Sequence, residues 1–301
     1  MVGYKIGIVI FPQVQELDFV GPYEIFTTWK TLANTAAATA AAPGTGTNIV
    51  DACWIVSEQG KQIRGKQGLV VLPDLSFADC PDLDILVVPG GIGTRTEEHN
   101  PIMLDFIQRQ ATKCRYVLSV CSGTFLLEKA GLLSNQTVTT HWKALPRLRH
   151  LTSMPDELGR TTRAYTSTNM HIVDNQRYTQ NTNANSTGPS IWCSGGVSAG
   201  MDMTLAFVAD VANDAGYMAG QIQLQMEYYP DATIYGQTRE QIQQLVPYVR
   251  TKTNTNTAAG GGSPSSTSTT ILNTTSTQPP EQEGGQNTNN NWYFLANQTL
   301  H

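Results

Sequence analysis

The residue with the clearest capacity for chemistry is Cys121, in the segment "YVLSVCSG" at positions 116–123. An apolar run typical of a strand ends on this thiol, and a helical pattern, "TFLLEKAGLL", follows two small residues later. A nucleophile at the sharp turn between a strand and a helix is held exposed and strained. The first N–H groups of the helix point at it, and their partial positive charge favours thiolate over thiol. The pattern therefore predicts a reactive cysteine with a lowered pKa.

A second reading of the same residues stays open, because most buried cysteines are small, inert core residues. What favours chemistry is the turn "PGGIGT", which follows the preceding apolar strand. In a parallel sheet this turn lies beside Cys121, and backbone N–H groups at Gly91 and Ile92 are expected to bind substrate and to stabilise developing negative charge. The same glycines lack the full spacing of a dinucleotide-binding fingerprint.

The elements that must position these residues alternate along the chain. Nearly continuous apolar runs predict strands, and periodic segments predict helices. The strands are expected at 4–11, 50–56, 68–72, 83–88, 116–120, 137–140 and 191–194. The first helix is expected to have Pro22 in its first turn and to run to residue 32. Further helices are expected at 102–112, 124–130, 142–148 and 195–212. This order indicates an α/β fold with a mostly parallel sheet covered by helices on both faces.

Composition limits the classes of partner. The 301 residues carry 19 Lys and Arg against 24 Asp and Glu, a net charge of −5, and no basic cluster stands out. A nucleic-acid or membrane partner is therefore not expected. Five cysteines stand singly, without the spacing of a zinc site or a disulfide framework, which suits a reducing compartment. No apolar run has the length of a transmembrane helix, and the N-terminus reads as a strand rather than a signal peptide, so a cytoplasmic location is expected.

Three segments depart from the alternating pattern. Residues 34–48 are low in complexity and predict a surface insertion, and residues 166–189 predict a long hairpin or a loose loop. Residues 251–301 are rich in Thr, Asn, Ser, Gly and Gln and predict a disordered tail. The expected catalytic domain therefore covers residues 1–250.

Several blocks in order resemble the ThiJ/PfpI superfamily, which is related to the class I glutamine amidotransferases. They are "FPQVQELDFVGPYEIF", "SFADCPDLDILVVPGG", "YVLSVCSGTFLLEKAGLL", "TVTTHW" and "GGVSAGMDMTLAFVADV". Within the superfamily the sequence looks most similar to the isonitrile hydratases, and the likeness continues to residue 230. The resemblance implies a flavodoxin-like α/β sandwich, a homodimer, and Cys121 as the nucleophile.

The resemblance also places an acidic partner at Asp18. A carboxyl group beside a thiolate in a poorly solvated pocket has a raised pKa, stays protonated and acts as general acid. The alternatives are that Asp18 only caps the first helix, or that Glu24 is the acid. The isonitrile hydratases have Thr after the cysteine, whereas this chain has Ser122, whose hydroxyl is expected to bond to Asp18 or to a water molecule.

Other chemistries fit the residues less well. Peptidase-like members of the superfamily have His directly after the nucleophile, where this chain has Ser122. His141, in "TTHW", is expected to have a structural role or to lie at the pocket edge. No set of His, Cys, Asp or Glu has the spacing of metal ligands.

The sequence therefore predicts hydration of an isonitrile to an N-substituted formamide, with Cys121 attacking, Asp18 supplying the proton and Ser122 helping to position water. No cofactor or metal is needed. The alternatives are glyoxalase- or deglycase-type chemistry on α-oxoaldehydes, and a small-molecule or redox-sensing module related to the amino-terminal domain of AraC-type regulators.

Overall fold

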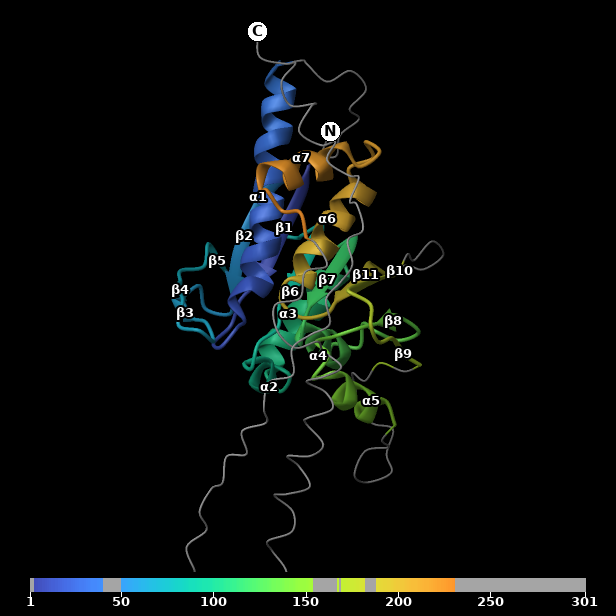
Figure 1. The fold of residues 1–301 in the computed structure, drawn as a ribbon. Coiled ribbons are helices and arrows are strands. Elements are labelled where there is room, and N and C mark those ends of the chain that lie inside the picture. Colours follow the sequence, from blue (N-terminus) through green and yellow to red (C-terminus); the bar gives the residue numbers. More distant parts are fainter. Residues whose placement is uncertain (1–2, 40–49, 154–166, 168, 182–187, 231–301) are drawn as a thin grey trace, which may run out of the picture. The chain divides into compact units, whose positions relative to one another are not determined.

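The strand that ends at Cys121 lies inside a seven-stranded sheet. The computed structural model describes residues 3–39, 50–153, 167, 169–181 and 188–230. The strand order is β10-β11-β7-β6-β1-β2-β5 (Figure 1). All neighbouring strands are parallel except β10 and β11. The strands are β1 (Tyr4–Val9), β2 (Val50–Ser57), β5 (Leu75–Ser76), β6 (Ile85–Val88), β7 (Tyr116–Val120), β10 (Tyr178–Asn181) and β11 (Ser190–Ser194).

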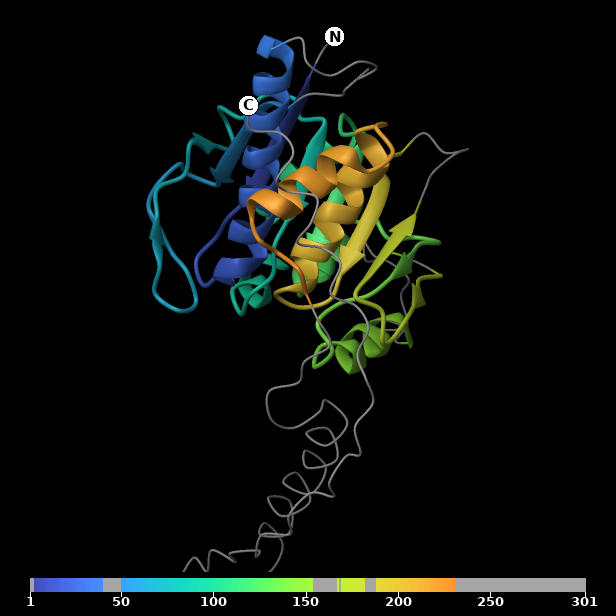
Figure 2. The ribbon, with the colours of Figure 1, turned by 45° about the horizontal axis from the view of Figure 1, so that its top comes forward.

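Helices cover both faces of the sheet, as the sequence predicts. One face carries α1 (Glu16–Thr39), α6 (Ala199–Val211) and α7 (Tyr217–Gln225) (Figures 1 and 2). The other carries α2 (Thr94–Glu97), α3 (Pro101–Ala111) and α4 (Gly123–Lys129). The central strands β6 and β7 are buried apart from Tyr116, because both of their faces are packed against helices. The flavodoxin-like architecture is therefore confirmed.

The remaining described elements lie outside this sheet. The strands β3 (Ile63–Arg64) and β4 (Val70–Val71) form an antiparallel pair, and β8 (Thr137–Val138) pairs in parallel with β9 (His171–Ile172). The helix α5 (Leu145–Ser153) follows β8. No helix in the described ranges is long and apolar enough to cross a membrane.

The first helix begins earlier than the sequence predicts. It starts at Glu16, and Pro22 lies inside it rather than in its first turn. Proline has no N–H, so the helix lacks the bond that this position would make to the Asp18 carbonyl. Burial of Phe19, Phe26 and Trp29 against the sheet keeps the segment helical in spite of this loss. The early start places Asp18 in the first turn of α1.

The irregular segments are partly ordered. Residues 34–39, at the start of the predicted surface insertion, continue α1, and 40–49 lie outside the described residues. Residues 171–172 and 178–181 form strands, and the second of these is the antiparallel edge of the main sheet. The predicted strand at 68–72 is only the short β4 and does not join the main sheet. The predicted tail at 251–301 lies outside the described residues.

Candidate active site

The turn at Cys121 is strained, as predicted. Its φ is 57°, a left-handed conformation that is uncommon for a residue with a side chain. The Cys121 N–H donates to the carbonyls of Ser194 at 3.2 Å and Gly195 at 3.0 Å, and its carbonyl accepts from Thr140 Oγ1 at 2.6 Å. These bonds hold the strained backbone in place and aim the side chain out of the line of β7.

The turn after β6 lies directly beside Cys121, because β6 and β7 are neighbours. A Cβ atom at Gly90 would lie 2.5 Å from the Ser122 nitrogen and 2.9 Å from Asp18 Oδ2. Only glycine fits there, because three separate segments meet at this point: the start of α1, the turn after β6 and the turn after β7.

Asp18 is completely buried beside the thiol. Its Oδ2 accepts a hydrogen bond from the Gly90 N–H at 3.1 Å. Burial raises its pKa to about 7, although the Cys121 thiol, the Gly90 N–H and the charge of Lys66 act in the opposite direction. The predicted upward shift is confirmed. Glu24, the alternative acid, is exposed and does not line the pocket described below.

The predictions for the Cys121 thiol itself are wrong in two respects. Only 8 % of the residue is exposed, and its pKa is raised rather than lowered. Burial is the main cause, followed by the negative charge of Asp18; the Ser122 N–H and hydroxyl oppose the shift but do not outweigh it. The sulfur therefore keeps its proton at neutral pH, and it lies beside a carboxyl whose pKa is about 7.

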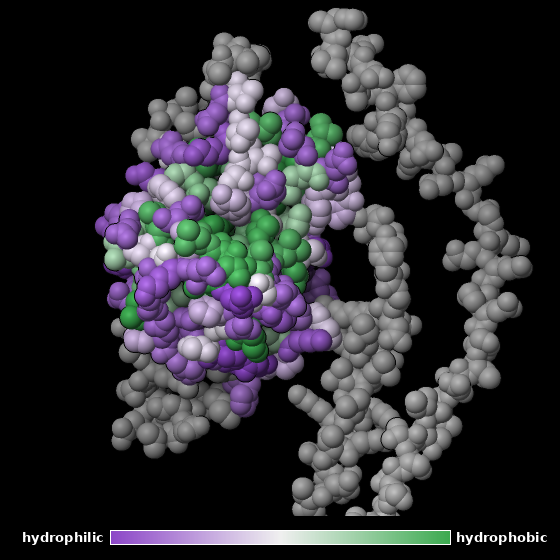
Figure 3. Space-filling view, turned by 90° about the vertical axis from the view of Figure 1, so that its left-hand side faces the viewer, coloured by the Kyte–Doolittle hydropathy of each residue, from purple (hydrophilic) through white to green (hydrophobic). Residues whose placement is uncertain are grey.

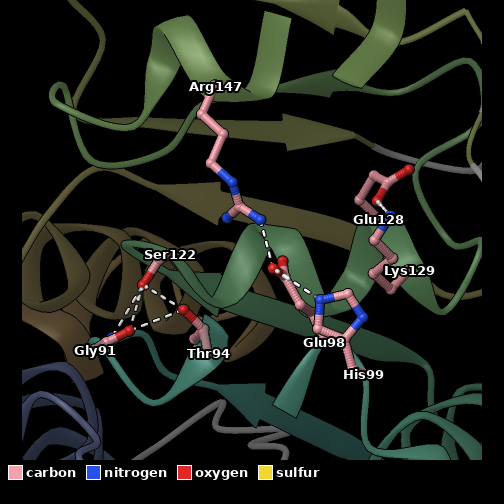
Figure 4. Close-up of polar contacts among 8 residues, drawn as sticks. All are labelled: Gly91, Thr94, Glu98, His99, Ser122, Glu128, Lys129 and Arg147. Carbon is pink, nitrogen blue, oxygen red and sulfur yellow. Dashed lines mark hydrogen bonds and ion pairs between the residues drawn. The ribbon is translucent and has the colours of Figure 1, made fainter. Parts of the chain in front are cut away.

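Ser122 fixes the neighbouring turn, and its hydroxyl bonds to Gly91 and Thr94 rather than to Asp18. Its Oγ accepts from the Gly91 N–H at 3.0 Å, lies 3.1 Å from the Gly91 carbonyl, and accepts from Thr94 Oγ1 at 3.2 Å (Figure 4). The Gly91 N–H is therefore already occupied, which corrects its expected role as a donor to substrate charge. The Ser122 N–H, which lowers the Cys121 pKa, is the donor that faces the sulfur.

A pocket of about 500 Å³ opens above the thiol. It lies at the carboxyl end of the parallel strands, where ligands bind in open α/β sheets. Ile92 lines it and is 54 % exposed. The lining residues are Gln13, Gln15, Lys66, Gly91, Ile92, Thr94, Arg95, Cys121, Ser122, Phe125, His141, Ala144, Arg147 and Val197.

His141 reaches this pocket from the loop after β8. Its Nδ1 accepts a hydrogen bond from the Lys143 N–H at 3.2 Å, so the ring proton of the neutral imidazole is on Nε2. A Cβ atom at Gly196 would lie 2.1 Å from the ring. The histidine ring therefore packs close to Gly196 in the loop before α6 and lines the pocket.

Sequence reasoning missed Val197. This β-branched residue has a φ of 48°, it lines the pocket, and its backbone hydrogen bond lowers the pKa of Asp18. Such strain is a rare outlier for valine. The "GG" before it was the available signal, because paired glycines mark a tight backbone path. Among the described residues no group of three or more His, Cys, Asp or Glu side chains is arranged to hold a metal ion.

Comparisons with known proteins agree with this geometry. The model of the DJ-1/PfpI family matches residues 4–182, more than half of the chain. The chain belongs to the DJ-1/PfpI family. An isonitrile hydratase from Pseudomonas putida is 31% identical over 231 residues, which covers 75% of this chain and 79% of that protein. The family assignment and the recognised resemblance are thereby confirmed.

Other relatives have names that state different functions. The deglycase PfpI of Pyrococcus furiosus is 31% identical over 29% of this chain and 54% of its own length. The HTH-type transcriptional regulator GbdR of Pseudomonas aeruginosa is 31% identical over 41% of this chain and 31% of its own length. A solved ThiJ/PfpI family protein from Pseudomonas syringae has a TM-score of 0.62 at 23% identity, covering 84% of this chain and 88% of that one, which shows the shared fold.

Proposed function

We propose that this protein hydrates isonitriles to N-substituted formamides. The observation that carries the proposal is the pairing of the buried Asp18 carboxyl, whose pKa is about 7, with the Cys121 thiol at the base of the pocket. A group with a pKa near neutrality both accepts and donates protons efficiently. The similarity to the isonitrile hydratase along three quarters of the chain supports the choice of reaction.

The reaction begins with a proton transfer that the pair makes possible. The Asp18 carboxylate takes the thiol proton as the sulfur attacks the isonitrile carbon and forms a C–S bond. Asp18 then gives the same proton to that carbon, which leaves a thioimidate, Cys121–S–CH=N–R, and a regenerated carboxylate. Asp18 thus acts first as base and then as acid, because the free pair holds its proton on sulfur.

Water completes the cycle. Asp18 removes a proton from the water as its oxygen bonds to the thioimidate carbon, and it passes that proton to the nitrogen, which gives Cys121–S–CH(OH)–NH–R. Collapse of this adduct breaks the C–S bond, moves the hydroxyl proton to sulfur by way of Asp18 and releases R–NH–CHO. The net change adds one water to R–NC, with no oxidation or reduction. The Ser122 N–H stabilises charge on the sulfur as it leaves.

The decisive test is formamide production from an uncharged aryl isonitrile. The wild type is expected to turn it over, Cys121→Ala to lose all turnover, and Asp18→Asn to lose at least about 100-fold in kcat, within the range of general acid–base catalysis. Cys80→Ala is the matched control, because Cys80 is also 8 % exposed but lies in the core beside α3, and it should keep full activity.

Two other outcomes separate the alternatives. Consumption of an α-oxoaldehyde by the wild type, without isonitrile turnover, would assign the site to deglycase-type chemistry. Neither activity, with small-molecule binding retained, would assign it to sensing. The pairing with Asp rather than Glu, and Ser122 in place of His, favour the hydratase reaction.

A further inference from the structure

The wall of the pocket carries an uneven distribution of charge. Three cationic side chains line it: Lys66, Arg95 and Arg147. No Asp or Glu is among the residues that line it. A concave site lined by one sign of charge concentrates its field on a ligand of the opposite sign. The three cations differ, however, in whether their charge is already matched.

The charge of Arg147 is matched within the protein. Its Nη2 lies 2.5 Å from Glu98 Oε1, and Glu98 is buried (Figure 4). The guanidinium carbon also lies 4.3 Å from the centre of the Phe125 ring, a cation–π contact. Arg147 is therefore a fixed part of the wall, and a substrate gains little from its charge.

Lys66 and Arg95 lack such partners. Lys66 lies between β3 and β4, and its Nζ donates to Gln15 Oε1, a neutral acceptor, at 3.3 Å. Arg95 lies on α2. Within the described part of the chain neither makes an ion pair. The positive charge of Lys66 lowers the pKa of the Asp18 carboxyl.

We propose that the pocket takes substrates that carry a carboxylate at the end remote from the reacting carbon, held by Lys66 and Arg95. The reacting end lies at Cys121, and the two cations lie at the exposed side of the same cavity. Its volume of about 500 Å³ suits a small organic molecule with two functional ends. The identity of the reacting end rests on the proposed function, but the recognition of an anion does not.

The first test uses two alkylating reagents of similar size, one negatively charged and one neutral. Iodoacetate is an anion and iodoacetamide is neutral, and the rate at which each alkylates Cys121 is measured by mass spectrometry of the peptide that contains it. Arg95→Gln and Lys66→Met are each expected to lower the ratio of the iodoacetate rate to the iodoacetamide rate by about 3-fold, the size of a partly exposed charge interaction. A change in the reactivity of the thiol alters the rates of both reagents by the same factor, so it cancels in the ratio. High salt should lower the wild-type ratio in the same way.

Lys113→Met is the matched control. Lys113 is half-exposed and precedes β7, so it lies at the opposite end of the strand from Cys121, and its removal should leave the ratio unchanged. An unchanged ratio in both Arg95→Gln and Lys66→Met would overturn the inference whatever reaction the protein catalyses.

The second test compares an aryl isonitrile bearing a para-carboxylate with its uncharged methyl ester. The wild type should have the lower KM for the carboxylate, and Arg95→Gln should raise that KM by about 3-fold while leaving kcat and the ester unchanged. Equal KM values for both substrates would refute carboxylate recognition while leaving the hydratase function intact. A change in the alkylation ratio without turnover of either isonitrile would keep the anion site and refute the hydratase function.

Discussion

At the scale of single residues, the Cys121 thiol and the Asp18 carboxyl share one buried environment. A buried thiol and a buried carboxyl side by side cannot both ionise cheaply, so the pair keeps at least one proton at neutral pH. The environment raises the pKa of both groups, and the carboxyl ends near 7, where a proton moves in either direction at little cost. The same burial that makes the pair reactive destabilises the fold.

Replacement of Asp18 by Asn should stabilise the protein while it lowers the proposed hydratase activity at least about 100-fold. The folded-state pKa of about 7 exceeds the reference value of 3.8, so the folded chain binds more protons between these values, and stability falls as pH rises through this window. The loss of unfolding free energy caused by ionising buried Asp18 is absent below about pH 4 and complete above about pH 7. Its upper bound is about 4 kcal/mol.

Urea unfolding of the wild type and Asp18→Asn at several pH values measures this difference. The variant should exceed the wild type in unfolding free energy above pH 7, and the difference should shrink towards pH 4. A constant difference across the range would contradict the raised carboxyl pKa. Asp105→Asn is the control, because Asp105 is an exposed carboxyl on α3, and its replacement removes one carboxylate without changing the buried pair.

At the scale of elements, the site is made by the ends of strands rather than by any one element. The turn after β6 supplies Gly90, the turn after β7 supplies Cys121 and Ser122, and the first turn of α1 supplies Asp18. Gly90 is the position where these three approach most closely, since its missing side chain leaves room for the Ser122 backbone and the Asp18 carboxyl.

Gly90→Ala should therefore damage activity far more than it damages the fold. The added methyl would overlap the Ser122 nitrogen at 2.5 Å and Asp18 Oδ2 at 2.9 Å. Asp18 and the turn that carries Cys121 and Ser122 must therefore move to make room for it. We expect a loss of at least about 10-fold in kcat, because a shift of about 1 Å at a reacting group costs up to 100-fold. Gly220→Ala in α7 is the control: nothing lies within 4 Å of the added atom, and activity should be unchanged.

How far the sequence predicted these elements depends on the range of the interactions involved. The strand at 116–120 and the glycine closing α4 were predictable, because apolar runs and Gly131, with its φ of 76°, are local signals. The raised pKa of Cys121 was not, because it depends on burial by distant segments. The bond from Gly91 to Ser122 was missed for the same reason, since 31 residues separate its partners. The start of α1 at Glu16 was missed because tertiary packing outweighed the local signal of Pro22.

At the scale of the whole molecule, one side carries exposed apolar side chains. Figure 3 shows them gathered on the side of the molecule where β3, β4 and β5 lie, with polar side chains around them. The large exposed apolar residues of α1 and of the segment around β4 are Leu17, Val20, Leu69, Val70 and Leu72. Apolar patches of this kind mark interaction sites. The family resemblance implies a homodimer, and we propose this patch as the surface that the second copy covers.

Charged substitutions in the patch should separate the copies. Leu72→Glu and Leu69→Glu, at 74 % and 48 % exposure, place a carboxylate in the proposed interface without disturbing the core. Sedimentation of the wild type is expected to give a dimer and of the double variant a monomer. Ile102→Glu is the control, because Ile102 is 54 % exposed on α3, on the other face of the sheet, and should leave the dimer intact. A monomeric wild type would refute this arrangement.

The bonds from the Cys121 amide to Ser194 and Gly195 also bear on the order in which the molecule is made. Cys121 emerges from the ribosome about 70 residues before the carbonyls that bend its backbone, and long-range pairings of this kind form late in folding. Until β11 has docked beside β7, the Cys121 amide lacks the two acceptors that hold it in the left-handed conformation, and the sheet edge next to it is open. A nascent or partly folded chain therefore carries this cysteine without its strained turn, and the geometry of the candidate site forms only with the completed sheet.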